Sequence, residues 1–353
     1  MGFCSIILVE MLALYPARAF SNDNQQIGTN VLKDRLRNFW RKYGPWISPW
    51  QILQGAVAAI LLGLAALVPH RVASNAGSAV ARALGPLFHW HRRGMANLAH
   101  VYPEMSKAER RRIMDGVWDN LGRTMGEFAR ILKVGETVTV SGLEYIPPEG
   151  TPAIFVTAHM ANWEALTCFS HLCGRDLLNI YRRPNNVYVD KLLKLRSYGL
   201  PVRLIEKNKR AGIHLLRQLR AGGAITLFVD QKGTTGDVVV PFMGKDAITI
   251  RTPALLAART GATVIAGRMI RTNRHDLHID ILPPLPPITD ISPETERAFM
   301  QQINDILTAW VEETPEQWLW IHRRWKNADT QAADAKAADA TAGANGQQPS
   351  SVS

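Results

Sequence analysis

Residues 153–165 read AIFVTAHMANWEA and change their pattern at the centre. The segment 153–158 is apolar and β-branched, which predicts a buried strand, and the segment 163–173 predicts a helix. His159 therefore stands at the end of a strand, and Glu164 stands in the first turn of the next helix. On one continuous helix these side chains would point in different directions, but a strand-to-helix junction lets them converge.

The same alternation of strand and helix patterns continues along the chain. Further strands are predicted at 137–141, 177–182, 202–206, 225–230, 238–242, 263–270 and 277–282. Further helices are predicted at 187–198, 210–220, 253–260 and 293–312. This order predicts an α/β fold with a mostly parallel central sheet flanked by helices on both faces.

Two short motifs predict helix starts outside this alternation. Ser106 and Glu109 form a capping box that opens a helix running to about residue 132. Thr314 and Gln317 form a second box, with Pro315 at the first helical position, which predicts a short terminal helix.

An uncharged stretch from residue 44 to residue 68 precedes the α/β pattern. The segment 52–68 is apolar except for Gln54, close to the shortest length that spans a bilayer, and Trp46 and Trp50 lie at its edge. Both flanks are basic, so the charge rule gives no orientation. We expect a membrane-associated helix; a helix lying in the interface and a buried core helix are the alternatives.

The composition sets the domain limits and the class of partner. We expect a variable extension at 1–43, the apolar helix at 44–70, the α/β domain at 71–326 and a disordered low-complexity tail at 327–353. The formal charge of +11 predicts anionic partners, but no zinc-finger spacing, RNP-like strand or dimerising basic helix supports nucleic acid.

The three cysteines form no CxxC motif and suggest a reducing compartment. We read Cys168 and Cys173 as small apolar side chains, because free cysteine is usually buried. Cys168 as a nucleophile is a weaker alternative, since nothing cationic in the sequence marks it as a thiolate. We expect no metal and no cofactor.

Polar residues follow three of the predicted strands. They are His159, then Arg182 and Arg183, then Asp230, Gln231 and Lys232. Ligands of open α/β sheets bind at the carboxyl ends of strands, so we expect these residues in one cleft. An imidazole beside a carboxylate can accept a hydroxyl proton, although a structural histidine and a first-turn glutamate explain the same pattern.

Five motifs, taken together and in order, resemble one family. They are "RRGMANLAHVYPEMSKAERRRIM", "HMANWE", "IYRRPNN", "LFVDQKG" with "VPFMGKDAIT", and "PEQWLWIHRRWK". This set resembles the lipid A biosynthesis acyltransferases, the late lauroyl and myristoyl transferases of the wider lysophospholipid acyltransferase superfamily. The resemblance covers roughly residues 50–326.

The resemblance implies roles for individual residues. It makes His159 the catalytic base and Glu164 its acidic partner. It implies a substrate-binding set of Arg182, Arg183, Asn186, Asp230, Gln231, Lys232, Phe242, Arg323 and Arg324. Within "WIHRRW" we expect Trp318 and Trp320 to point inward and both arginines to point outward.

The chain departs from the family pattern at two positions. Ala161 stands where the family usually has Gly, so a turn with positive φ would be strained by about 1 kcal/mol or more there. Arg183 stands where Pro commonly follows the arginine.

The resemblance also implies a function. We expect a membrane-associated enzyme, on the cytoplasmic face of the inner membrane, that moves a fatty acyl chain from acyl carrier protein to a hydroxyl of a lipid A precursor. The basic charge would then serve an acidic donor and an anionic glycolipid acceptor. The alternatives are a glycerophospholipid or phosphatidylinositol mannoside acceptor, or a non-catalytic, membrane-tethered lipid-binding module.

Overall fold

The computed structural model describes residues 48–194, 200–208, 210–234 and 236–325 in two compact units. The first unit holds residues up to Ile60 together with Pro184–Leu193, and the second holds Leu61–Arg183 and the chain from Lys194. The predicted extension at 1–43 and the predicted tail at 327–353 lie outside the described residues.

The first unit joins the start of helix α3 (Pro49–Leu67) to helix α9 (Val187–Lys194). Asn186 makes this joint: its amide donates to the Gln51 carbonyl at 2.9 Å and to Gln54 at 3.0 Å. Its carbonyl oxygen accepts from two backbone N–H groups of the first turn of α9. Asn186 therefore works as a helix cap that also holds α3.

Helix α3 is long and apolar enough to cross a membrane, and Gly55 is its one buried residue. A core helix of a soluble protein would be mostly buried. The alternative prediction of a buried core helix is therefore wrong.

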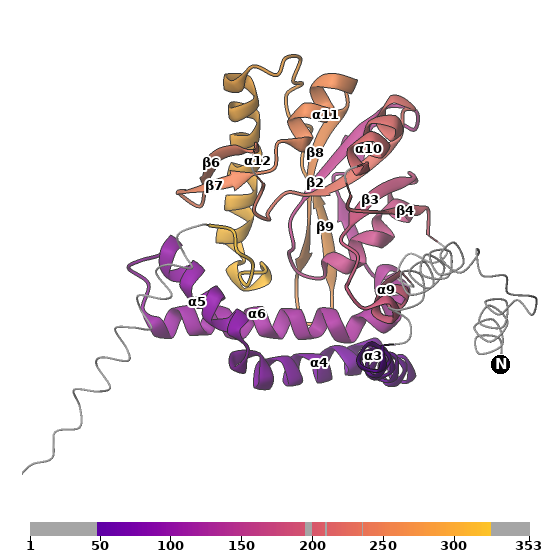
Figure 1. Ribbon diagram of the computed structural model, residues 1–353, viewed down its shortest axis with the longest axis vertical. Helices are drawn as coiled ribbons and strands as arrows, with labels where there is room; N and C mark the ends of the chain where they lie inside the picture. Colours follow the sequence, from indigo (N-terminus) through magenta and orange to yellow (C-terminus); the bar gives the residue numbers. More distant parts are fainter. Residues whose placement is uncertain (1–47, 195–199, 209, 235, 326–353) are drawn as a thin grey trace, which may run out of the picture. The chain divides into compact units, whose positions relative to one another are not determined.

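A seven-stranded sheet forms the centre of the second unit, in the order β1-β9-β8-β2-β5-β3-β4 (Figure 1). Its strands are β1 (Thr139–Ser141), β2 (Ala153–Thr157), β3 (Leu177–Tyr181), β4 (Val202–Glu206), β5 (Ala224–Phe228), β8 (Thr263–Arg271) and β9 (Leu277–Ile281). The five strands from β8 to β4 are parallel, whereas β9 is antiparallel to β8. The predicted mostly parallel α/β fold is confirmed.

Helices cover both faces of the sheet, so its strands are apolar on both sides. Ile154 and Val156 of β2 pack into the cluster that contains α10 (Ala211–Arg220), α11 (Thr252–Thr260) and α12 (Pro293–Glu313). The intervening Phe155 packs on the other face with α7 (Ile131–Gly135) and α8 (Phe169–Leu172), which follows the short 3-10 helix η5 (Trp163–Cys168).

A separate hairpin lies against α12. Its strands are β6 (Val238–Phe242), which was predicted, and β7 (Lys245–Thr249), which was not. The segment KDAIT begins with two charged residues and resembles a loop in the sequence. The hairpin turns at Met243 and Gly244, both with positive φ.

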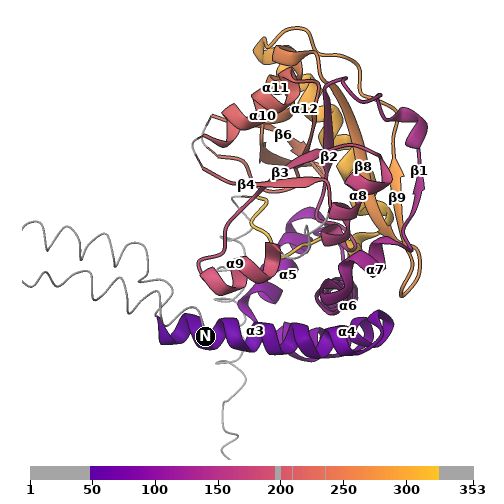
Figure 2. The ribbon, with the colours of Figure 1, turned by 90° about the vertical axis from the view of Figure 1, so that its right-hand side faces the viewer.

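Helices α4 (His70–Leu84), α5 (His89–Val101) and α6 (Lys107–Glu127) lie between α3 and the sheet in the chain. The predicted capping box of Ser106 and Glu109 is present at the start of α6. Helices α4 and α6 lie side by side in both views (Figures 1 and 2). They approach so closely that a Cβ on Gly122 would lie 2.3 Å from the Gly77 carbonyl oxygen.

The predicted terminal helix is wrong. Up to residue 325, where the described chain ends, one 3-10 turn, η7 (Pro315–Gln317), follows α12, and the Thr314 side chain does not cap it. Trp318 then forms an isolated β-bridge with Met160, the Leu319 N–H donates to the His159 carbonyl at 3.2 Å, and the chain turns at Trp320 and Ile321. The rings of Trp318 and Trp320 lie 4.9 Å apart, and both are buried as predicted.

Candidate active site

Three parallel strands deliver the predicted site residues to one edge of the sheet. Strands β2 and β5 are paired throughout, and β3 is the next neighbour of β5. His159, Asp230 and Arg182 follow the carboxyl ends of β2, β5 and β3. The predicted shared edge is therefore present.

His159 and Asp230 form the central contact of this edge. The ring Nδ1 of His159 lies 2.9 Å from Oδ1 of Asp230, and the His159 backbone N–H donates to Oδ2 at 3.0 Å. The Trp318 indole N–H also donates to Oδ2, at 2.9 Å. The His159 side chain keeps 17% of its surface exposed, while that of Asp230 keeps 1%.

Asp230 is held ionised despite its burial. Burial by itself raises the pKa of the carboxyl, but the electrostatic attraction of His159 and the hydrogen bonds from His159 and Trp318 outweigh it. The net effect is a pKa well below the usual range of an aspartate. A permanent carboxylate at Nδ1 fixes the tautomer that leaves Nε2 as the proton acceptor.

The His159 ring has a carboxylate contact that the sequence did not predict. Asp230 and Gln231 lie within hydrogen-bond distance of the ring, so Asp230 is a carboxylate that orients it. The predicted partner, Glu164, lies in the first turn of η5, where Asn162 makes the capping contact by accepting from the Ala165 N–H at 3.3 Å. Its role as the acidic partner stays a prediction.

A second imidazole, which the sequence reading missed, completes the site. The Gln231 amide nitrogen lies 3.3 Å from Nε2 of His159 and 3.2 Å from Nε2 of His322. Burial and the nearby charge of His159 lower the pKa of His322 to about 4, so this ring is neutral at pH 7. The signal for it was present in "WIHRRW", where we considered only the arginines and tryptophans.

The loop between His159 and η5 contains an unusual backbone conformation. Ala161, in the position where the family usually has Gly, has a φ of 45° and is fully buried. The left-handed conformation anticipated as a source of strain is therefore present.

Two residues of the predicted substrate-binding set are buried in the core instead. Phe242 is 1% exposed and stacks on Trp325 at 5.7 Å. Arg324 is 0% exposed, and its guanidinium donates to the carbonyl of Ile248 and the hydroxyl of Thr249. The predicted outward direction of Arg324 is wrong, although the residue lines the smaller pocket described below.

Asp230, also buried, and Gln231 lie at His159 as described above, and the remaining members lie on the surface or in the first unit. Arg182, Arg183, Lys232 and Arg323 are exposed. Asn186 belongs to the first unit, where it caps α9.

The structure disfavours Cys168 as a nucleophile. Its side chain is buried, and burial raises the pKa of the thiol. A thiol with a raised pKa is protonated at neutral pH and is a poor nucleophile.

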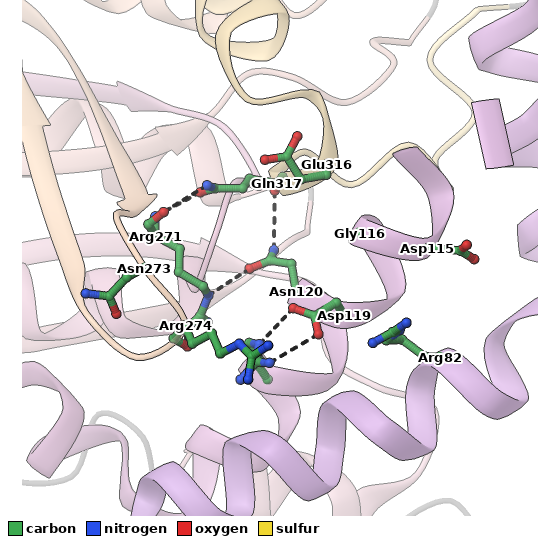
Figure 3. Close-up of a pocket in the computed structure, with 11 residues that line it drawn as sticks. Arg82, Asp115, Gly116, Asp119, Asn120, Arg271, Asn273, Arg274, Glu316 and Gln317 are labelled. Atoms are coloured by element: carbon green, nitrogen blue, oxygen red, sulfur yellow. Dashed lines mark hydrogen bonds and ion pairs between the residues drawn. The ribbon is translucent and has the colours of Figure 1, made fainter. Parts of the chain in front are cut away.

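Two cavities lie near the site. One, of about 330 Å³, is lined by residues of α4, α6, the β8–β9 turn and η7, including Asn120, Arg271 and Gln317 (Figure 3). A smaller one, of about 210 Å³, lies beside Lys232 and Trp325. Among the described residues, no group of three or more potential side-chain ligands could hold a metal ion.

Comparisons with known proteins agree with this architecture. The family profile described as bacterial lipid A biosynthesis acyltransferase matches residues 48–327. The lipid A biosynthesis lauroyltransferase of Escherichia coli (strain K12) is 24% identical over 245 residues, which cover 65% of this chain and 77% of that enzyme. The palmitoleoyltransferase of the same organism is 23% identical over 241 residues, covering 65% and 76%.

A solved structure was also found. The 1-acyl-sn-glycerophosphate (LPA) acyltransferase from Thermotoga maritima aligns over 69% of this chain and 99% of its own, with a TM-score of 0.34 and 13% identity. The family profile, in contrast, spans most of the chain and includes every site residue described above. The protein therefore belongs to the bacterial lipid A biosynthesis acyltransferases and is an acyltransferase.

Proposed function

We propose that this chain moves a fatty acyl chain from acyl carrier protein to a hydroxyl of a lipid A precursor, the hydroxyl of a primary hydroxyacyl chain. The observation that carries the proposal is the His159–Asp230 pair at the open edge of the sheet, with its Nε2 nitrogen directed away from the carboxylate. This is the arrangement that a general base for a lipid alcohol requires.

In the first step, Nε2 of His159 takes the proton of the acceptor hydroxyl as its oxygen attacks the thioester carbonyl. Asp230 accepts the hydrogen bond of Nδ1–H throughout and stabilises the imidazolium that forms. The acceptor hydroxyl takes the place of the Gln231 amide at Nε2, where the resting contact is long, at 3.3 Å.

In the second step, the tetrahedral oxyanion collapses, the carbon–sulfur bond breaks, and the carrier thiolate takes the proton from His159. The displaced Gln231 amide, still held by Nε2 of His322 at 3.2 Å, is a suitable donor for the oxyanion. A thiolate is a good leaving group, so this scheme involves no covalent enzyme intermediate and no cofactor beyond the donor.

The exposed cations support anionic substrates on both sides of the reaction. Arg182 follows β3 and Lys232 follows β5, so both start from the edge that holds His159. A phosphorylated acceptor and an acidic carrier protein each carry negative charge that such residues attract. The net charge of +11 extends the same attraction over the chain.

Two consecutive helices support membrane association. Helix α3 is apolar on all sides and mostly exposed. Helix α4 is amphipathic in an unusual sense: small residues such as Ala73 and Ser74 face α6, whereas its large apolar residues face outward. The outward stripe consists of Val72, Ala76, Val80 and Leu84 and continues into Leu87.

The spacing of this α4 stripe is that of one helical face. Leu87 is 80% exposed, and Phe88 and Trp90 follow it as exposed aromatic side chains of the kind found at membrane interfaces. A lipid surface is the partner that this apolar face fits, and the donor's location then places the site on the cytoplasmic side of the inner membrane.

A transfer assay tests the proposal. Acyl carrier protein loaded with a radiolabelled lauroyl chain would be incubated with a lipid A precursor and the detergent-solubilised protein. We expect label in the lipid with wild type, and losses on the order of 10³-fold with His159→Ala and Asp230→Asn. Lys107→Gln, an exposed change at the start of α6, serves as the control.

Three outcomes would contradict parts of the proposal. Undiminished transfer by His159→Ala would refute the base. Transfer to lysophosphatidic acid, and none to the lipid A precursor, would replace the acceptor. Binding of the precursor without any transfer by wild type would favour the lipid-binding module.

A further inference from the structure

Glu127 forms a buried ionic contact directly behind the site, on the last turn of α6. Its carboxylate is 1% exposed and accepts four hydrogen bonds. Arg271 at the end of β8 contributes two of them, at 2.8 and 2.9 Å, and the Ser74 hydroxyl contributes a third at 2.8 Å. The fourth donor is the Asn162 amide, at 2.7 Å.

This last contact links the ion pair to the loop that carries His159. Asn162 is fully buried, and both ends of its side chain are used. Its amide nitrogen donates to Glu127, and its oxygen accepts from the Ala165 N–H. Asn162 is therefore fixed between α6 and η5, three residues after His159.

Arg271 holds the neighbouring residue, Ala161, through two intermediates, Asn120 and Gln317; Figure 3 shows the contacts of Arg271 with both. Its Nε donates to the Asn120 side-chain oxygen at 3.1 Å, and the Asn120 amide donates to the Ala161 carbonyl at 3.0 Å. The Gln317 side chain pairs with the backbone of Arg271, and the Gln317 carbonyl accepts from the Ala161 N–H at 3.0 Å.

Thr124 also contacts this carbonyl. Its hydroxyl lies 3.1 Å from the Ala161 oxygen and 3.0 Å from the Asn120 carbonyl oxygen, so the two oxygens share its one proton. Ala161 has a φ of 45°, and its backbone N–H and carbonyl are both hydrogen-bonded. The partners are surrounding side chains and the backbone of η7. Strained conformations persist where the surroundings over-determine them in this way.

We propose that Glu127 and Arg271 are positioning residues for the transfer reaction: they hold the Ala161–Asn162 turn, and through it they place His159 against Asp230. Neither touches the reacting atoms. The proposal rests on the proposed function only for its kinetic test.

Glu127→Gln is the primary variant, and Glu296→Gln is its matched control. Glu296 is also buried, 2.6 Å from Arg251, and contacts no residue of the loop. We expect Glu127→Gln to lower kcat by about 10²-fold, as displacement of a catalytic group by about 1 Å does, with KM for both substrates nearly unchanged. Glu296→Gln should lower the melting temperature similarly but keep kcat.

Hydrogen exchange gives a readout that needs no activity. In Glu127→Gln the peptide 158–165 should exchange about tenfold faster than in wild type, and in Glu296→Gln it should not. If wild type transferred nothing to the lipid A precursor, the proposed function would fail while this exchange result would still decide the positioning role.

Two further variants keep the test informative if Glu127→Gln folds poorly. Thr124→Val removes one bond to Ala161 and should lower kcat about fivefold, the loss of about one ordinary hydrogen bond, at unchanged KM. Asn162→Asp sets two carboxylates against each other, and adding Glu127→Gln restores a donor–acceptor pair.

The double variant should therefore be more active than Asn162→Asp alone. The proposal is overturned if folded Glu127→Gln keeps wild-type kcat and exchange, or if Glu296→Gln loses as much kcat. It is also overturned if the second substitution brings no recovery.

Discussion

His322 shares the Gln231 amide with His159. Burial, and then the charge of His159, lower the pKa of His322 from an ordinary value near 6.5 to about 4. At a pH between these two pKa values, His322 binds a proton in the unfolded chain but not in the folded chain. The stability that a neutral His322 contributes is therefore present above about pH 6.5 and is lost as the pH falls towards 4.

We predict that this titration is visible in the stability of the whole protein. Wild type should lose about 3 kcal/mol of unfolding free energy from this group between pH 6.5 and pH 4. His322→Gln should flatten that part of the curve, whereas His89→Gln, at an exposed position, should leave its slope as in wild type. Denaturant midpoints across this pH range measure both, and equal slopes in all three proteins would refute the prediction.

The residues of the site were foreseen better than their partners. Strand ends can be read from the sequence, so His159 and Asp230 were both expected at one edge. Which carboxylate touches the ring depends on strand order, and β5 lies beside β2 although about 70 residues separate them. The sequence pointed to Glu164 through its spacing from His159, and a contact between strand ends as far apart as His159 and Asp230 leaves no such pattern.

Burial of a charged residue is also hidden in the sequence. Arginine is almost never fully buried unless its donors are paired. Arg324 meets this condition, because carbonyl and hydroxyl oxygens of the β6–β7 hairpin and α12 accept hydrogen bonds from its guanidinium. None of these oxygens is near it in the sequence, so an outward arginine was the reasonable expectation.

At the scale of elements, the contact between α4 and α6 depends on glycine. A Cβ added to Gly122 would meet the Gly77 carbonyl carbon at 2.6 Å and Ala81 at 2.7 Å, so one helix backbone would have to move. Gly212, in α10, has no atom within 4 Å of the same position. The two glycines therefore make a matched pair.

We predict opposite effects of alanine at these positions. Gly122→Ala should destabilise the protein by about 2–3 kcal/mol through overpacking. Gly212→Ala should stabilise it by about 0.5–1 kcal/mol, because alanine favours a helix. Thermal unfolding followed by circular dichroism compares them, and a Gly122→Ala protein as stable as wild type would show that the helices are not packed this closely.

The elements that the sequence missed share a physical cause. Strand β7 forms because it pairs with β6 across a turn. The chain after η7 is held by a partner distant in the sequence, since Trp318 forms a β-bridge with Met160. The strands and helices of the central sheet were foreseen because their own apolar periodicity specifies them. The pattern of apolar residues predicts an element whose own apolar side chains are buried. It does not predict an element whose conformation depends on hydrogen bonds to a backbone partner.

At the scale of the whole molecule, the second unit exposes both cationic side chains and the outward apolar stripe of α4. Val80 is 57% exposed and Leu87 is 80% exposed, well above what a helix facing water usually shows for such residues. Insertion of this stripe into a lipid monolayer would remove about 25 cal/mol of unfavourable free energy for each Å² of apolar surface covered. It would also hold the enzyme at the lipid surface in which the proposed acceptor lies.

We predict that α4 lies within the lipid surface in the reconstituted protein. A cysteine replacing Val80 or Leu87, in a background with Cys4→Ser and Cys173→Ser, would carry an environment-sensitive fluorophore. Its emission should shift to the blue in anionic vesicles and be quenched by lipids labelled near the headgroup. As a control, a cysteine replacing Ile291, which is 42% exposed and lies outside α4, should show neither the blue shift nor the quenching. If the fluorophore at Val80 or Leu87 also showed neither effect, α4 would lie in water and the prediction would be wrong.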